Sequence, residues 1–489
     1  TFNHYFIINV DDPSKWTQLT PGFYSFNAAA FVPGSKKIIV CGDIDSLRHP
    51  DRSLESAIYV VNNDGSGLRE LAGLKGWSYS SPVVSPDGRY VAFQYSRIEA
   101  LTIPQLAVIT LTDTVSRTEI PFDRNIGNVA WSDDSKYIYF TAQTSGVQPL
   151  YRAEPTSRKI VRLTDSSSAS GIMSFDIAGD HLVYVKTQVA DPFDLYEAGA
   201  DGTAEKRISD FNYSWVSARQ LSMPEKHVFT NSKGQLIDYW IMKPANFQQG
   251  KKYPLLVEIH GGPTAMWGPG ESTMWHEYQF FCGKGYGVVY SNPRGSGGYG
   301  VNFMRSNMND WGAGPTSDVL TALDKTVSSQ PWVDTSKLVI TGGSYGGYLV
   351  AYIIAHDHRF KAACSQRGVF DLGTFFGEGN AWRLVPYYFG GYPWQPATKA
   401  TLQRESPINY VQAITTPYII FHGETDRRTG TTQGEMMFRS LKVLNRPVEY
   451  VRHPGATHEI TRSGNNRQRI DQMLRTYEFF ERWIGKKTF

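Results

Sequence analysis

The sequence predicts two domains: an all-β propeller with fewer blades than usual at residues 1–220, and an α/β domain with a doubly wound, mostly parallel sheet at residues 221–489. Three observations lead to this prediction. A hairpin unit recurs through the first half, strands and helices alternate through the second half, and a length of 489 residues accommodates two or three domains.

The repeated unit is a short strand, a turn of Pro, Asp, Gly or Ser residues, and a second strand rich in β-branched and aromatic residues. Its copies are residues 31–40, 84–93 and 131–140, with a looser one at 176–185. A second hairpin lies between copies, around turns such as residues 60–65 and 111–114. Four strands in about 50 residues is the period of a propeller blade, so we expect about four blades and part of another. A sandwich with coincidental turns is the alternative.

The second half alternates short apolar strands with helix-length stretches, which predicts a mostly parallel sheet covered by helices. The expected strands are residues 255–259, 287–290, 338–341 and 418–421, and the expected helices are residues 317–328, 348–356, 433–444 and 467–484. In such sheets the active site lies at the carboxyl ends of the strands.

Residues 342–346 read Gly-Gly-Ser-Tyr-Gly, directly after an expected strand and before an expected helix. This G-x-S-x-G pattern in this context predicts a nucleophile elbow, in which a strained turn exposes the Ser344 hydroxyl at the end of the sheet. The domain is therefore expected to be an α/β-hydrolase with Ser344 as its nucleophile. A glycine-rich turn with an incidental serine is the alternative.

The triad partners follow in the order acid, then histidine. Asp426 lies in the polar loop after the strand at residues 418–421 and is the expected acid, with Glu424 as the alternative. His458 lies in a loop between a further expected strand, residues 448–452, and the last expected helix, residues 467–484, and is the expected base.

Acyl transfer also needs hydrogen-bond donors directed at the oxyanion. Residues 260–263 read His-Gly-Gly-Pro and follow the first parallel strand, where such hydrolases supply one of these donors. We expect the backbone N–H groups of Gly262 and Tyr345 to form the oxyanion hole. A plain tight turn at residues 260–263 is the alternative.

Composition excludes several classes of function. Lys and Arg number 49 and Asp and Glu 46, and a net charge of +3 offers no electrostatic excess to bind nucleic acid. No apolar run is long enough for a membrane span. The cysteines Cys41, Cys282 and Cys364 show no metal-ligand spacing, so we expect no metal and no other cofactor.

In its second half the chain resembles the prolyl oligopeptidase family of serine peptidases, and most of all the acylaminoacyl-peptidase and dipeptidyl peptidase 5 branch. The stretches that carry the resemblance are residues 260–263, 291–300, 342–348, 365–369, 422–426 and 458–464. The family has an N-terminal propeller, usually with seven or eight blades. With about four, either N-terminal blades have been lost or removed, or the propeller is reduced.

The resemblance implies that Ser344 is the nucleophile, His458 the general base and Asp426 the acid that orients it. Family members with a tyrosine at the position of His260 use its hydroxyl for the oxyanion. This sequence has histidine there, which favours the backbone of Gly262.

The substrate pocket is expected among aromatic side chains in residues 375–392, and Arg367 and Arg428 carry charges near the expected site. Each arginine has a surface role as its alternative. The expected substrate-binding residues are Phe376, Trp382, Tyr387, Tyr388 and Arg428.

These features together predict a serine exopeptidase that acts near the N-terminus of peptides, by dipeptidyl or acylaminoacyl release. A carboxylesterase with the same triad and a propeller-based binding protein are the alternatives. The expected partners are peptide substrates, with a homo-oligomer left open. The chain starts at Thr1 without a visible targeting segment, and only the resemblance to secreted bacterial relatives favours a periplasmic or extracellular location.

Overall fold

The computed structural model describes residues 2–44, 54–98, 101–112, 117–164, 169–271 and 275–485. Part of the turn expected at residues 111–114 lies outside them. The chain divides into two compact units. The first comprises residues 1–144, 148–186 and 193–211, and the second comprises residues 145–147, 187–192 and 212–489.

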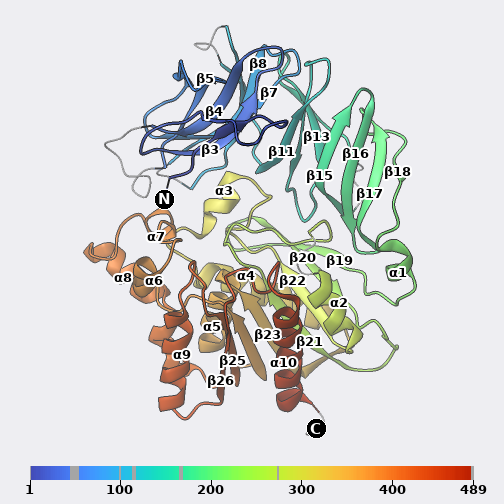
Figure 1. The fold of residues 1–489 in the computed structure, drawn as a ribbon. Coiled ribbons are helices and arrows are strands. Elements are labelled where there is room, and N and C mark those ends of the chain that lie inside the picture. Colours follow the sequence, from blue (N-terminus) through green and yellow to red (C-terminus); the bar gives the residue numbers. More distant parts are fainter. Residues whose placement is uncertain are drawn as a thin grey trace. The chain divides into compact units, whose positions relative to one another are not determined.

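The first unit consists of four-stranded antiparallel sheets, each formed by consecutive strands (Figure 1). A short hairpin of β1 (Phe6–Ile8) and β2 (Trp16–Gln18) precedes them. The first sheet has β3 (Ser25–Phe31), β4 (Lys37–Asp43), β5 (Ala57–Asn62) and β6 (Arg69–Ala72), and the second has β7 (Trp77–Val84), β8 (Tyr90–Arg97), β9 (Gln105–Thr110) and β10 (Arg117–Ile120). The third has β11 (Ile126–Trp131), β12 (Ile138–Ala142), β13 (Leu150–Glu154) and β14 (Lys159–Arg162), and the fourth has β15 (Ser170–Ala178), β16 (His181–Gln188), β17 (Asp191–Gly199) and β18 (Lys206–Arg207).

The repeated turn has the same hydrogen bonds in successive sheets. In the second sheet Ser85 Oγ donates to Asp87 Oδ1 (2.6 Å) and accepts from the Tyr90 N–H (2.9 Å). In the third sheet Ser132 Oγ accepts in the same way from the Tyr137 N–H (2.9 Å). Short polar side chains that bond to nearby backbone stabilise turns of this kind, so the sequence repeat is a structural repeat.

Each sheet of the first unit packs its apolar side chains against the next sheet. Ile39 of β4 shares a buried cluster with Phe93 of β8, and Val108 of β9 shares another with Phe140 of β12. A further cluster joins the third sheet to the fourth. Consecutive sheets packed face to face are the arrangement of propeller blades, and the predicted fold class of this region is confirmed as propeller-like.

The second unit contains an eight-stranded sheet with the order β19-β20-β22-β21-β23-β24-β25-β26 (Figure 1). Strand β20 pairs antiparallel with both β19 and β22. Every other neighbouring pair in the sheet, from β22–β21 to β25–β26, is parallel. The strands are β19 (Glu225–Thr230), β20 (Leu236–Met242), β21 (Tyr253–Ile259), β22 (Gly287–Ser291), β23 (Val333–Gly343), β24 (Ala362–Gln366), β25 (Tyr418–Gly423) and β26 (Val448–His453). The α/β prediction for this region is confirmed.

Helices pack against this sheet and close its core. Phe281 of α2 and Phe480 of α10 lie in one buried cluster with Leu256 and Val339 of the central strands. The helices are α1 (Tyr213–Ser217), α2 (Trp275–Gly283), α3 (Val301–Met304), α4 (Ala313–Ser329), α5 (Tyr345–His356), α6 (Leu372–Glu378), α7 (Leu384–Phe389), α8 (Pro396–Glu405), α9 (Thr431–Val443) and α10 (Asn466–Ile484), with 3₁₀ turns at Arg305–Asn307 and Pro407–Ala413. Within the described residues, no helix combines the length and apolar character that crossing a membrane requires.

Candidate active site

Ser344 lies between the end of β23 and the start of α5, with φ 59° and ψ −119°. A positive φ is rare for a residue with a side chain and is characteristic of strained functional turns. The turn also requires close approach of the backbone, because a Cβ at Gly346 would lie 2.1 Å from the carbonyl oxygen of Ile259. Only glycine fits there, which is the steric requirement of a nucleophile elbow.

The structure brings the three expected triad side chains into one hydrogen-bonded line. His458 Nε2 lies 3.0 Å from Ser344 Oγ, and His458 Nδ1 lies 2.7 Å from Asp426 Oδ2. Ser344 and His458 are 114 residues apart in sequence, and they meet because their loops follow parallel strands that end at one edge of the sheet. The alternative acid, Glu424, is exposed and faces Arg452 and the Gly455 amide instead.

Asp426 is ionised in this environment. Burial alone would raise the pKa of its carboxyl, but the hydrogen bond from His458 and those from two backbone amides outweigh burial and lower the pKa. The amides are those of Arg428 (2.8 Å) and Thr429 (3.0 Å), both to Oδ1. Oδ2 is thereby left for the histidine.

His458 is neutral at neutral pH, because burial lowers the pKa of its imidazole to about 4, even though the Asp426 carboxylate favours the charged form. A carboxylate can only accept a hydrogen bond, so the ring carries its proton on Nδ1. The lone pair on Nε2 then faces the hydroxyl of Ser344. A neutral base within hydrogen-bond distance of a hydroxyl is suited to removing its proton.

The two amides expected to form the oxyanion hole are close to the nucleophile. Tyr345 is the first residue of α5, where helix N–H groups have no intrahelical partner. The loop that contains Gly262 passes beside Ser344, since a Cβ at Gly261 would lie 3.2 Å from Ser344 Cβ. Among the turn and loop hydrogen bonds of the described residues, none has the N–H of Gly262 or Tyr345 as its donor. Their role as oxyanion donors stays a prediction.

The ring of His260 is engaged elsewhere. It is 1% exposed, and its Nε2 and Nδ1 atoms lie 2.8 Å from Ser296 Oγ and from the Gly261 carbonyl oxygen. Burial lowers the pKa of this imidazole to about 4. Both ring nitrogens of His260 therefore have partners within the protein.

The expected substrate-binding residues differ in exposure. Phe376 and Trp382 are half-buried and meet edge to face, with ring centroids 5.7 Å apart. Tyr387 is half-buried, whereas Tyr388 is fully buried against Trp311 (5.1 Å). Arg428 is exposed on the acid loop. Tyr392 and Trp394 extend the aromatic cluster around Phe376.

The aromatic cluster lies next to the acid loop. The N–H of Asn380, between Phe376 and Trp382 in the sequence, donates to the Arg427 carbonyl oxygen (2.7 Å). A Cβ at the neighbouring Gly379 would lie 2.6 Å from the Arg428 carbonyl oxygen. The segment with the expected pocket residues is therefore attached to the loop that carries Asp426.

Sequence reasoning missed Thr429. Its hydroxyl lies 3.1 Å from Asp426 Oδ2 and 3.3 Å from His458 Nδ1, and its carbonyl accepts from His422 (2.7 Å). The available signal was local, because a threonine three residues after an aspartate is typical of a turn in which the carboxylate accepts backbone N–H bonds. For Arg367 the expected surface alternative is wrong, since the residue is 6% exposed.

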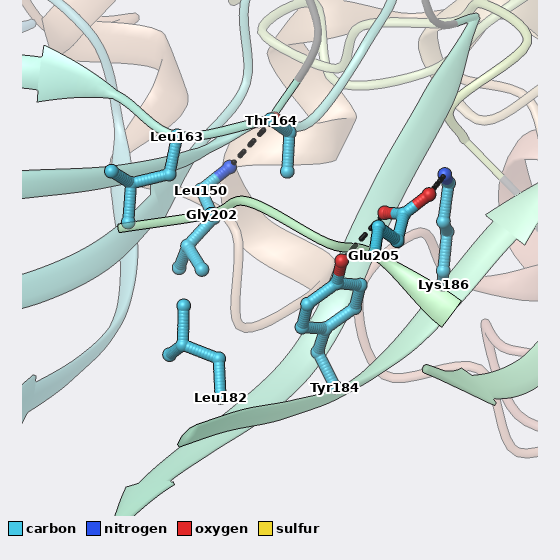
Figure 2. Close-up of a pocket in the computed structure, with 8 residues that line it drawn as sticks. All are labelled: Leu150, Leu163, Thr164, Leu182, Tyr184, Lys186, Gly202 and Glu205. Carbon is cyan, nitrogen blue, oxygen red and sulfur yellow. Dashed lines mark hydrogen bonds and ion pairs between the residues drawn. The ribbon is translucent and has the colours of Figure 1, made fainter. Parts of the chain in front are cut away.

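A cavity of about 260 Å³ is lined by residues of the first unit (Figure 2). Leucine side chains line part of it, and Lys186 pairs there with Glu205 (2.6 Å), which also accepts from the Tyr184 hydroxyl (2.5 Å). It contains none of the expected catalytic residues. Within the described residues no cluster of His, Cys, Asp and Glu side chains is suited to hold a metal ion.

Comparison with known proteins relates this chain to a family and to a fold. Residues 271–487 match the prolyl oligopeptidase family. The chain is 33% identical over 366 residues to an uncharacterized peptidase, YuxL, of Bacillus subtilis, covering 72% of this chain and 53% of that protein. It is 26% identical over 446 residues to dipeptidyl-peptidase 5 of Trichophyton tonsurans, covering 88% of this chain and 61% of that protein.

The fold is similar to that of Pyrococcus horikoshii acylaminoacyl peptidase, with a TM-score of 0.85, 22% identity, and coverage of 99% of this chain and 75% of that one. At this identity the likeness concerns the fold. The chain spans between half and two thirds of the length of the curated relatives given above.

Proposed function

Because the chain belongs to the prolyl oligopeptidase family, we propose that it is a serine peptidase that releases short units from the N-terminus of peptides. The observation that carries the proposal is the hydrogen-bonded line from Ser344 through His458 to Asp426, with a neutral histidine between an ionised carboxylate and a hydroxyl. This is the arrangement that activates a serine for acyl transfer.

In the first step His458 Nε2 takes the hydroxyl proton of Ser344 while Oγ attacks the scissile carbonyl carbon. The C=O π electrons move to the oxygen, and the N–H groups of Gly262 and Tyr345 donate to this oxyanion. Asp426 stabilises the imidazolium through Nδ1–H. When the tetrahedral intermediate collapses, the C–N bond breaks and His458 returns its proton to the leaving amine.

In the second step water resolves the acyl-enzyme. His458 takes one proton from water, the hydroxide adds to the ester carbonyl, and collapse breaks the bond to Ser344 Oγ, which recovers a proton from His458. The acid product leaves and the triad returns to its starting state.

Specificity for the residue before the scissile bond is assigned to the aromatic cluster with Phe376 and Trp382 beside the acid loop. Tyr387, Tyr388 and Arg428 were also expected to bind substrate, and for the buried Tyr388 a supporting role behind Trp311 is more consistent with its burial. Apolar pockets distinguish side chains by only about 1–3 kcal/mol per methylene, so we expect broad acceptance of apolar residues.

Release of N-terminal units is supported by similarity to dipeptidyl-peptidase 5 and by the fold likeness to an acylaminoacyl peptidase. The two activities differ in the group that precedes the cleaved bond. A dipeptidyl peptidase requires a free α-amine two residues upstream of that bond, and an acylaminoacyl peptidase accepts an acylated single residue.

The test uses four nitrophenyl substrates that share phenylalanine before the cleaved bond: a dipeptidyl anilide with a free amine, the same anilide N-acetylated, an acetyl-phenylalanine anilide, and an acetyl-phenylalanine ester. Turnover of the first alone indicates dipeptidyl release, and turnover of the third indicates acylaminoacyl release. Turnover of the ester without any anilide would show a carboxylesterase and contradict the proposal. The Ser344→Ala variant is the control for hydrolysis by contaminants.

A further inference from the structure

Arg367 is a buried cation directly behind the elbow. It follows the last residue of β24, is 6% exposed, and has a φ of 47°, in the left-handed region that side chains rarely adopt. Burying a guanidinium is costly unless neighbouring groups compensate it, and a strained backbone persists only where its surroundings impose it. Both features indicate that this position does more than complete a strand.

The backbone around Arg367 is bonded to the nucleophile loop and the acid loop. The carbonyl of the preceding residue, Gln366, accepts from the Ser344 N–H (2.8 Å), and the Arg367 N–H donates to the Phe421 carbonyl in β25 (2.7 Å). The Arg367 carbonyl accepts from the hydroxyl of Thr429 (3.1 Å), whose own N–H donates to Asp426. One residue thus lies between the elbow and the turn that holds the acid.

The side chain of Arg367 reaches the third loop. Its Nη1 donates to Thr461 Oγ1 (2.5 Å), three residues after His458. Its Nη2 lies next to Gly343, the residue before Ser344, since a Cβ built on Gly343 would be 3.0 Å from Nη2. The guanidinium therefore spans from beneath the elbow to the histidine loop.

The charges around the guanidinium come from several elements, and both signs are present. Glu277 of α2, together with Asp426 and Glu459, partly compensates the positive charge, and Arg462 opposes it. Arg462 is itself paired with Glu459 (2.7 Å). The charged and titratable groups that interact with Arg367 are Glu277, His422, Asp426, His458, Glu459 and Arg462.

We propose that Arg367 is a positioning residue that holds the nucleophile, acid and histidine loops in their reactive arrangement from behind the triad. The inference rests on the proposed function, because it assumes that Ser344 is the nucleophile. Arg367 does not touch the reacting atoms. Its own groups bond to Phe421, Thr429 and Thr461, and its guanidinium lies against Gly343, the residue before Ser344.

The charge on Arg367 adds an electrostatic part to this role. Burial is the largest cause of the lowered pKa of His458, and the hydrogen bond to Asp426 opposes it. The positive charge of Arg367 is the next largest cause and lowers this pKa further. A histidine with a lowered pKa remains a free base to a more acidic pH. Removing the charge should therefore move the acid limb of reactivity toward higher pH.

The experiment measures the rate at which a fluorophosphonate labels Ser344 in the full chain, as a function of pH, in the parent and in Arg367→Gln and Arg367→Lys. We expect Arg367→Gln to lower the plateau rate about 10- to 100-fold and to move the acid limb to higher pH. Arg367→Lys keeps the charge without the fork of donors, so it should keep the acid limb and still lose rate. Arg439→Gln, on the exposed face of α9, is the matched control and should behave like the parent.

An Arg367→Gln variant with the parent's rate and acid limb would overturn the proposal. So would a variant that loses rate without any movement of the limb while its unfolding midpoint also falls, because that pattern describes destabilisation alone. Thr461→Val removes only the acceptor hydroxyl and provides the test if Arg367→Gln does not fold; a rate equal to the parent's would count against the proposal.

The two proposals fail in different ways. A parent that is labelled at Ser344 but cleaves none of the anilides contradicts the peptidase proposal and leaves the role of Arg367 supported or overturned by the variants. A parent that is not labelled contradicts both, since it has no active nucleophile to position.

Discussion

The repeated turn of the first unit and the candidate active site of the second unit rely on polar contacts that span very different distances in sequence. In the propeller-like unit, Ser85 of a repeated turn bonds to Asp87, two residues away, and to Tyr90, five residues away. In the α/β unit, the bond between His458 and Ser344 joins residues 114 apart, and that between Arg367 and Thr461 joins residues 94 apart.

The difference follows from topology. Antiparallel neighbours in a sheet can be joined by short turns, so a turn and its hydrogen bonds are local and can repeat along the sequence. Parallel strands need crossover connections, and their carboxyl ends gather loops from distant parts of the chain. Reactive groups therefore meet in the second unit, whereas the first unit is a series of similar local structures.

The largest effect is expected where a long-range contact takes part in the reaction. Asp426→Asn should lower kcat about 10³- to 10⁴-fold. The amide of the asparagine can donate to His458 Nδ1, which places the imidazole proton on Nε2. A protonated Nε2 cannot accept the hydroxyl proton of Ser344. Anilide turnover measures the loss. Parent-like unfolding of the variant is the control, and a loss below tenfold would contradict the assigned acid.

The second-largest effect is expected for a buried contact that stabilises the fold of the second unit. Arg294 and Asp318 form a buried bidentate pair, with Nε–Oδ2 and Nη2–Oδ1 distances of 2.8 and 2.7 Å. Asp318→Asn leaves the guanidinium without its charge partner and should cost about 3–5 kcal/mol of unfolding free energy, measured by urea unfolding.

A local pair in the first unit provides the contrast to Asp318. Arg89 and Asp87, two residues apart on an exposed turn, form an ion pair at 2.6 Å. Arg89→Ala should leave the unfolding midpoint unchanged, because exposed ion pairs contribute little. Equal losses in both variants would contradict the contrast between the two units.

One buried carboxyl pair of the second unit should respond to pH in the opposite sense to the turn carboxyls of the first unit. In the second unit burial, and repulsion from Glu277, raise the pKa of Glu258 well above its usual value, and burial raises that of Glu277 to about 7. A carboxyl with a raised pKa in the folded state stabilises the fold fully only below its unfolded pKa. For Glu277 this contribution is lost as the pH rises from about 4.5, the unfolded pKa, through about 7, the folded pKa. In the first unit Asp87 and Asp134 have lowered pKa values, and their contribution is lost as pH falls.

Glu277→Gln removes one of these buried protons and can still bond to Gln366. We expect it to raise the unfolding free energy by about 1–2 kcal/mol at about pH 8, with no gain below the unfolded pKa of glutamate. Thermal unfolding at both pH values measures the difference. A gain that is the same at acid and alkaline pH would contradict a buried proton at this site.

The smallest loss that should still be measurable is expected for a serine of the repeated turn. Ser132→Ala removes the acceptor of the Tyr137 N–H and should cost about 1 kcal/mol of unfolding free energy. Ser157→Ala, at an exposed turn of the same sheet, is the control and should have no measurable effect. A cost for Ser132 as large as that for Asp318 would show that the first unit also depends on single contacts.

Sequence patterns predicted most of the fold because the patterns are local. The expected strand at residues 418–421 lies within β25, and the expected helix at residues 467–484 lies within α10. The elbow was equally accessible, since the need for glycine around Ser344 is a steric requirement within five residues. The order of acid and histidine along the chain indicated their loops.

The sequence by itself determined the repeat period, the alternation of strands and helices, and the three side chains expected to meet at one edge of the sheet. Only the tertiary structure decided that Arg367 is buried behind the elbow, that Thr429 lies against both Asp426 and His458, and that Tyr388 is buried. The physical reason is that periodicity and turn sterics act between near neighbours, whereas burial and long-range hydrogen bonds depend on crossovers that bring distant loops together.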